Sequence, residues 1–315
     1  MDVPATGSLY VARRGEDPHD RGVSDESWSG LGMDDVFARL DRCATEIGRQ
    51  TLYRRLRRAS DGSAAVTAVD RRVRAFAADE ALRAGFAGAV APLASEGALA
   101  GLLWGDACVE RGDVLAPIDR LLAAALAVAA LESERVADDL DALRLALVVA
   151  EEWRRTVVKE TTATLLGFVK VVFRLDVDAF VLTRELERGR PALRRLAEII
   201  GELDVAQAVA GFRAESAAWS VPAIGRRGAP LVMTGMRDPL GAGTAADDVL
   251  FVFESSTHDE TTPLKSIAVQ SILAQSIATT TCEGYAAPFV TEDDFVTRCA
   301  ARLSRVSSND DAALR

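Results

Sequence analysis

The chain has 315 residues, a hydrophobic content of 49% and a formal net charge of -10. This composition excludes a disordered chain and allows a substantial core in two domains. The acidic balance argues against nucleic acid or an anionic membrane as a partner. Four widely spaced cysteines with no C-x-x-C pair are typical of a reduced, cytoplasmic protein. An aromatic content of only 6% beside many Ala, Leu and Arg residues favours helices.

The first part of the chain predicts an arm followed by a helix. Residues 1–30 are rich in Gly, Asp, Ser and Arg, and we expect a flexible N-terminal arm there. Apolar residues at helical spacing then run from Met33 to Arg58, which predicts one amphipathic helix. The basic cluster at its end is expected to be a solvated helix end, because cations are favourable there and the whole chain is acidic. This cluster contains Arg54, Arg55, Arg57 and Arg58.

Further helical patterns follow. The most apolar stretch, residues 115–131, contains Asp119 and Arg120, and its uninterrupted part is shorter than the roughly 18 residues that a membrane span needs. We therefore expect a buried helix there and no membrane contact. The expected helices cover approximately residues 63–90, 92–110, 116–135 and 137–171.

The next segment predicts two successive helices. Pro191 suits a first helical turn, and Asp204 is a plausible N-cap for a second helix that begins after "GELD". Trp104, Trp153 and Trp219 fall on helical patterns, where packing in the core or in a seam between helices is the default expectation.

An acidic group, Asp138, Asp139 and Asp141, is similar to the acidic motifs with which helical prenyl-transfer enzymes bind magnesium. Those enzymes need a second acidic motif that faces the first, and none stands out in this sequence. We therefore expect these three carboxylates to lie on a solvated helix face or to cap the helix, with no metal bound.

The pattern changes after residue 220. "APLVMTGM" (229–236) and "DVLFVFESS" (248–256) predict strands, and "TPLKSIAVQSILAQSIAT" (262–279) predicts a helix with a proline near its start. A strand, a polar turn and a helix form the layout of a phosphate-binding loop. The Walker pattern G-x-x-x-x-G-K-[ST] would occupy residues 254–261, but only Thr261 fits it.

Two helical segments resemble the core of the MutS family of ATPases. "GLGMDDVFARLDRCATEIGRQTLYRRLRR" (30–58) is similar to that family's D-x-x-F-x-x-L-D-x-T…G-x-x-x-L-x-x-x-L pattern. "RRLAEIIGELDVAQAVAGFRAE" (194–215) looks like the return helix of the family's lever. Nearer the C-terminus, "GAPLVMTGMRDPLG" is similar to the strand and "HPL" turn that enter the ATPase domain, with Asp238 in place of His. "SIAVQSILAQSIATTTCEGYAAP" is similar to the helix after the P-loop and the strand beyond it.

The resemblance covers residues 26–290 and implies a mainly α protein. It would have a MutS-like helical core and lever with a small, incomplete α/β unit, derived from a P-loop ATPase, at the C-terminal end. The sequence holds no counterpart of the family's Walker B acid. The expected division is an arm (1–30), a helical core and lever domain (31–220), a partial ATPase-like domain (221–290) and a polar tail (291–315).

The residues of the altered loop oppose ATP. Glu254 and Asp259 stand where the pattern has glycine, and Glu260 stands where it has the lysine that neutralises phosphate. Like charges 4 Å apart repel by roughly 4 kcal/mol at an effective dielectric constant of 20. We therefore expect no cofactor and no ATP hydrolysis.

Two functions remain open at this point. The first is a non-catalytic interaction or scaffold protein that binds a protein partner or a second copy of itself. The alternative is an enzyme that has reused the loop for acid/base chemistry on a small molecule, for example in a biosynthetic pathway. Its catalytic residues would be Glu254, His258, Asp259 and Glu260.

Overall fold

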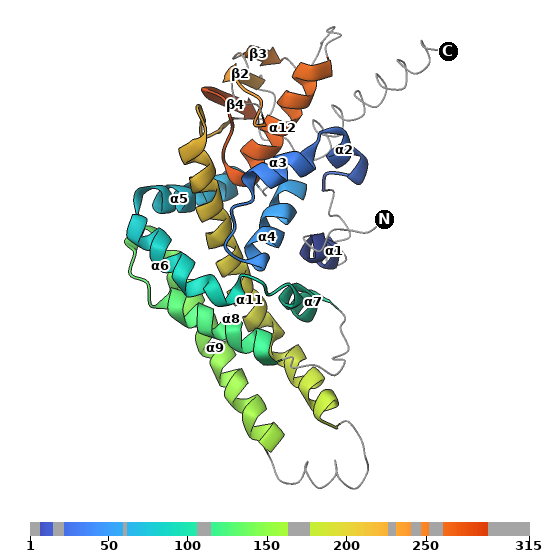
Figure 1. The fold of residues 1–315 in the computed structure, drawn as a ribbon, viewed down its shortest axis with the longest axis vertical. Coiled ribbons are helices and arrows are strands. Elements are labelled where there is room, and N and C mark those ends of the chain that lie inside the picture. The colour runs from blue at the N-terminus through green and yellow to red at the C-terminus, as the bar shows by residue number, and fades with distance from the viewer. Residues whose placement is uncertain are drawn as a thin grey trace, which may run out of the picture. The chain divides into compact units, whose positions relative to one another are not determined.

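The structure, a computed structural model, is mainly helical with a small mixed sheet (Figure 1). The predicted mainly α class with a small strand-containing part near the C-terminal end is therefore confirmed, while its MutS likeness stays a prediction. The structure describes residues 7–14, 22–58, 62–105, 115–162, 177–225, 231–240, 247–251 and 261–288.

Contacts divide the chain into two compact units that each draw on separate stretches of sequence. Two helices, α4 (Glu46–Arg57) and α11 (Val177–Glu215), contribute residues to both units. The boundaries expected in chain order, near residues 30, 220 and 290, stay a prediction. The first unit contains Met1–Glu16, Cys43–Thr51 and Asp79–Val205, and the second contains Asp17–Arg42, Leu52–Ala78 and Ala206–Arg315.

The first unit is built from helices that bury an apolar stripe. α8 packs against both α6 and α9, and α1 packs against α7 (Figure 1). Fully buried side chains such as Phe86, Leu121 and Leu143 fill the interior of this unit. Besides parts of α4 and α11, its helices are α1 (Ser8–Arg14), α6 (Glu80–Val90), α7 (Ala98–Trp104), α8 (Leu115–Ala129) and α9 (Ala137–Thr162), with short 3-10 turns at Ala91–Leu93 and Glu134–Val136.

The second unit combines helices with the sheet. The sheet has the strand order β1-β4-β2-β3, in which β4 is parallel to β1 and antiparallel to β2, and β2 is antiparallel to β3. α12 packs against α5. Besides parts of α4 and α11, the elements are α2 (Asp25–Gly30), α3 (Met33–Leu40), α5 (Ser63–Ala78), β1 (Ala223–Gly225), β2 (Leu231–Met236), β3 (Asp247–Phe251), α12 (Thr261–Ile277) and β4 (Gly284–Pro288).

The two predicted strands and the predicted helix after them are confirmed as β2, β3 and α12. β1 was not predicted. The short helices α1 and α2 lie within residues 1–30, which the sequence predicted as an arm. Residues 163–171 of the long helix predicted over 137–171 lie outside the described residues.

The single helix predicted from Met33 to Arg58 is wrong, because the chain leaves the helix after Leu40 and begins α4 at Glu46. The Thr45 hydroxyl accepts a hydrogen bond from the Gly48 backbone N–H at 2.9 Å. This bond satisfies a donor that has no partner inside the first turn of a helix. A capping residue in the middle of the amphipathic pattern thus splits it in two.

The expectation of two helices meeting at Asp204 is also wrong. α11 runs without interruption from Val177 to Glu215, and Pro191 lies inside it instead of in a first turn. Leu193, Leu196 and Ile200 are fully buried, so packing holds the helix together across the proline.

Two other packing expectations fail. Trp104 and Trp153 are buried as expected, but Trp219 lies beyond the end of α11 and is 41% exposed. In the basic cluster, Arg57 is buried instead of solvated: it donates to the Tyr53 hydroxyl and to the Val23 carbonyl.

Among the described residues, no single helix is both long and apolar enough to cross a bilayer. The segments Glu80–Leu93 and Ala98–Trp104 reach that length and hydropathy only when taken together, and they are bent by 77°.

Candidate functional site

The four residues predicted to carry chemistry, Glu254, His258, Asp259 and Glu260, lie outside the described residues. They belong to the connection between the end of β3 at Phe251 and the start of α12 at Thr261. The prediction that they form a site therefore stays a hypothesis from the sequence. Within the described residues, no group of three or more His, Cys, Asp or Glu side chains is placed to hold a metal ion.

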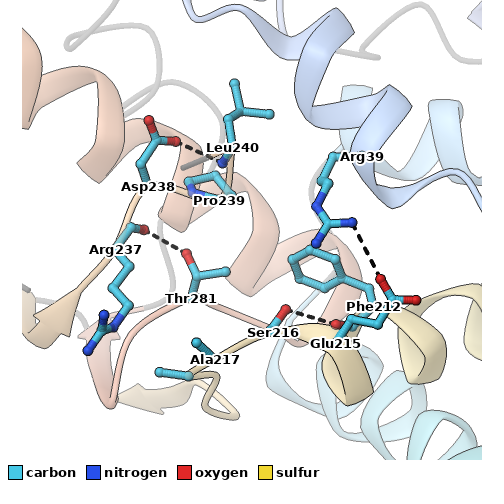
Figure 2. A pocket seen from close by; sticks show the side chains of 11 residues that line it. Arg39, Phe212, Glu215, Ser216, Ala217, Arg237, Asp238, Pro239, Leu240 and Thr281 are labelled. Carbon is cyan, nitrogen blue, oxygen red and sulfur yellow. Dashed lines mark hydrogen bonds and ion pairs between the residues drawn. The ribbon is translucent and has the colours of Figure 1, made fainter. Parts of the chain in front are cut away.

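The second unit contains a pocket with a volume of about 320 Å³ (Figure 2). Four parts of the unit form its walls: Arg39 near the end of α3, the C-terminal end of α11 with the residues just after it, the turn that follows β2, and Thr281 between α12 and β4. Figure 2 shows Arg39 and Phe212 on one side, and Arg237, Asp238, Pro239 and Leu240 on the other.

On the α11 side, arginines hold the carboxylate of Glu215. Both terminal nitrogens of Arg42 donate to it, and Arg39 lies 3.6 Å away. The Arg39 guanidinium also lies over the Phe212 ring, 5.8 Å from its centre. The hydrogen bond from Arg42 lowers the pKa of Glu215 and raises that of Arg42. Glu215 is consequently an ionised, paired acceptor at neutral pH and a poor source of protons.

On the opposite side, the backbone of Arg237 is held firmly. Its N–H donates to the Thr281 carbonyl at 3.0 Å, and its carbonyl accepts from the Thr281 hydroxyl at 2.7 Å. The buried side chain of Gln270 in α12 donates to the same carbonyl at 2.8 Å and accepts from the Thr281 N–H at 2.9 Å. One amide side chain therefore joins α12 to both chain segments that border the pocket.

The turn also depends on Gly235, whose φ is +56°. A Cβ at this position would lie 2.6 Å from the Cγ of Glu283 as well as being strained by the left-handed backbone. Glycine here lets β2 approach the start of β4 and sets the direction in which the chain reaches Arg237.

The side chain of Arg237 has unused hydrogen-bonding capacity. Its Nε is buried and makes no hydrogen bond within the part of the chain that the structure describes. The Oε1 atom of Glu283 lies 3.9 Å from its Nη2, which is beyond hydrogen-bond length. The neighbouring Asp238 accepts from the Leu240 N–H at 2.9 Å.

A buried arginine, Arg213, follows Phe212 in α11. Its guanidinium donates to Asp70 Oδ1 at 2.9 Å, to the Thr279 hydroxyl at 2.9 Å and to the Ala278 carbonyl at 2.7 Å. Burial lowers the pKa of Arg213, and the hydrogen bond to Asp70 opposes that effect. The Trp219 ring covers the guanidinium at 4.5 Å. Arg213 thus ties α11 to α5 and to the residues that follow α12.

A second buried charge on α11, Asp204, lies in the first unit. Its carboxylate accepts from the backbone N–H groups of Ala44 and Thr45 at 2.9 and 2.8 Å, and from the Thr45 hydroxyl at 2.7 Å. Asp204 was predicted as the cap of its own helix, but it binds the start of α4 instead. A Cβ on Gly48 would lie 2.1 Å from Asp204 Oδ2, so only glycine allows this approach.

Sequence reasoning missed Asp70, Arg213, Arg237 and Gln270. Arg213 could have been noticed, because it interrupts the apolar face of "AQAVAGFRAE". The roles of Arg237 and Gln270 left no comparable pattern, since Arg237 is 44 positions from Thr281 and 33 positions from Gln270.

No protein-family model matches this sequence. No curated protein sequence matches it either. The function must be inferred from the residues themselves.

Proposed function

We propose that this chain is a MutS-like protein that has lost ATP binding and hydrolysis and works as a non-catalytic interaction or scaffold protein. The altered loop supports the loss of ATP use, since Glu254, Asp259 and Glu260 place three carboxylates where phosphate would bind. The scaffold role is supported by the buried hydrogen bonds that hold α12, the helix after that loop, in place.

Protein groups fasten the C-terminal end of α12. Arg213 binds the Ala278 carbonyl and the Thr279 hydroxyl directly after this helix, and Asp70 of α5 completes the network. Gln270, inside α12, adds bonds to Arg237 and Thr281. Because these groups are buried and bonded to one another, the position of α12 does not require a nucleotide.

The contacts around Asp204 favour the family resemblance. The segments at 30–58 and 194–215 carry the resemblance in the helical part, and they meet where Asp204 binds the start of α4. Gly48 and Gly201 both lie at this contact, where a Cβ would come within 2.1 Å of Asp204 Oδ2 and 2.4 Å of Thr51 Oγ1, respectively. The glycines that these segments share with the family pattern thus have a packing reason.

The proposal is tested by thermal unfolding with magnesium and ATP. We expect no change in Tm for the native chain, because the loop repels phosphate. The matched variant Glu254→Gly, Asp259→Gly, Glu260→Lys restores the Walker residues, and we expect it to gain Tm. A ligand at 100 times its Kd stabilises a protein by about 2.7 kcal/mol.

Each outcome of this titration has a separate meaning. Stabilisation of the native chain by magnesium–ATP would refute the loss of ATP binding. If magnesium–ATP changes the Tm of neither protein, the result would contradict the P-loop origin of residues 254–261. A scaffold also predicts no turnover, so substrate consumption that is lost in His258→Ala would favour the alternative, acid/base catalysis at the altered loop.

A further inference from the structure

Helices α8 and α9 of the first unit expose an apolar face. The two helices pack side by side (Figure 1), and they hold the four most exposed large apolar side chains among the described residues. These are Leu145 (71% exposed), Val148 (67%) and Val149 (55%) in α9, and Leu126 (56%) in α8. Scattered apolar residues are normal on a protein surface, whereas a group of this kind marks an interaction site.

The three α9 residues form one line of side chains, which we call the α9 stripe. Leu145 lies three positions before Val148 and four before Val149, the spacing that brings side chains together on one face of a helix. The opposite face of α9 is buried through Leu143 and Ala150. α9 therefore has two apolar faces, and only one of them is covered within the described part of the chain.

Leu126 extends this surface onto α8. Asp119 of α8 accepts from Arg154 of α9 at 2.7 Å, and the Ala129 carbonyl accepts from Arg144 at 3.0 Å. Leu126 lies between the two α8 residues in the sequence, just as the α9 stripe lies between the two arginines. The four apolar side chains are therefore at the same level of the helix pair.

Exposed charges flank the α9 stripe in an order that reverses about its centre. Asp141 and Arg155 lie seven residues before and after Val148, and Arg144 and Glu152 lie four residues before and after it. If two copies pack antiparallel about Val148, each acid meets a base of the other copy. A parallel pairing would instead place each charge opposite itself.

The ion pairs within α9 agree with the antiparallel order. Asp141 pairs with Arg144, and Glu152 pairs with Arg155. Antiparallel packing brings the first pair of one copy beside the second pair of the other, so that the four charges alternate in sign. Single exposed ion pairs contribute little, whereas several charges in a network contribute more.

We propose that the α9 stripe and Leu126 bind a second copy of this chain, with the two α9 helices antiparallel about Val148. This inference deepens the proposed scaffold role, on which it rests, by naming the partner. An interface built on one helix from each copy falls at the small end of stable complexes, which bury roughly 800 Å² per partner. We therefore expect micromolar affinity and a mostly monomeric chain at the lower concentrations of unfolding experiments.

Sedimentation equilibrium of the full chain tests the proposal. We expect a monomer–dimer equilibrium in the micromolar range. Val148→Glu places two carboxylates against each other at the centre of the interface and should weaken dimerisation by about tenfold or more. Leu240→Glu is the matched control at an exposed leucine of the second unit and should leave dimerisation unchanged. Circular dichroism checks that both variants fold.

A charge exchange tests the antiparallel order. Asp141→Arg alone faces Arg155 of the other copy with a like charge and should weaken the dimer. Adding Arg155→Glu exchanges the two charges, which restores opposite signs across an antiparallel pair but leaves like signs across a parallel one. We therefore expect the double variant to recover most of the lost affinity.

Three results would overturn the proposal: a native chain that stays monomeric, undiminished dimerisation of Val148→Glu, or no recovery in the double charge variant. The first would mean that another protein or another segment of this chain covers the apolar face. None of these results depends on the response of the Tm to magnesium–ATP, so failure of the dimer and failure of the proposed loss of ATP binding are distinguishable.

Discussion

Two buried charges on one helix, Asp204 and Arg213 of α11, are stabilised at opposite ends of other helices. Asp204 accepts from N–H groups at the start of α4 in the first unit, whereas Arg213 donates to the carbonyl just beyond the end of α12 in the second. Helix N-termini carry partial positive charge and C-termini partial negative charge, so each ion meets the complementary end. The two sites differ in the groups that lose a partner if the charged side chain is removed. Removal of Asp204 leaves neutral backbone N–H groups without an acceptor, whereas removal of Arg213 leaves the charged carboxylate of Asp70 without a buried cation.

The largest loss of stability is expected when the buried cation, Arg213, is removed. Arg213→Met leaves Asp70 without its buried partner and should lower the free energy of unfolding by about 3–5 kcal/mol. The loss should fall toward the lower end, because Arg74 still contacts Asp70 Oδ2 at 2.6 Å. Urea unfolding followed by circular dichroism measures it.

The control for this variant is Arg155→Met, which removes an arginine that is 61% exposed and should change stability by less than about 0.5 kcal/mol. Adding Asp70→Leu to Arg213→Met should cost less than the sum of the two single changes. Strict additivity would show that the two side chains do not act as a pair.

A smaller loss of stability is expected when the buried anion, Asp204, is removed. Asp204→Ala removes the acceptor for two N–H groups and a hydroxyl, and should cost about 2 kcal/mol in urea unfolding. Asp204→Asn keeps one acceptor oxygen and should lose about half as much. Equal losses in the two variants would mean that the negative charge matters here and that the acceptor oxygen kept by Asn does not.

The smallest loss of stability is expected from a steric clash with the Asp204 carboxylate. Gly48→Ala places a Cβ 2.1 Å from Asp204 Oδ2 and should lower stability by about 1 kcal/mol or slightly more. Gly88→Ala is the matched control in α6, where a Cβ meets nothing within 4 Å, and it should raise stability by up to about 1 kcal/mol. If Gly48→Ala costs the same in the Asp204→Ala background, the clash is not with that carboxylate.

The sequence carries local information well and long-range information poorly. Apolar spacing located α8 and α12, because periodicity reports which face a helix buries. The helix expected over residues 63–90 is instead divided into α5 and α6 at Asp79, which caps α6. Asp204 was predicted to cap its own helix, but it lies inside α11, and its carboxylate accepts from Ala44, which is 160 positions away. Proline favours the first turn of a helix, which led to the prediction for Pro191, but its buried neighbours keep it inside α11.

The same limit applies to the candidate site. The chemistry of the altered loop can be read from Glu254 to Thr261, since the residue types alone conflict with phosphate. Arg237 gains its significance only from Thr281 and Gln270, which the fold brings beside it from other elements. Arg57 was misjudged for a related reason: its carbonyl partner Val23 lies in another segment.

Ala278 adds a consequence to the network around Arg213. It follows α12 with a φ of +53°, a left-handed conformation that costs a residue with a Cβ roughly 1–2 kcal/mol. The hydrogen bond from Arg213 to its carbonyl holds the chain in this strained state. Part of the free energy that the Arg213 hydrogen bond contributes is therefore offset by the backbone strain at Ala278, and loss of Arg213 would let this residue relax.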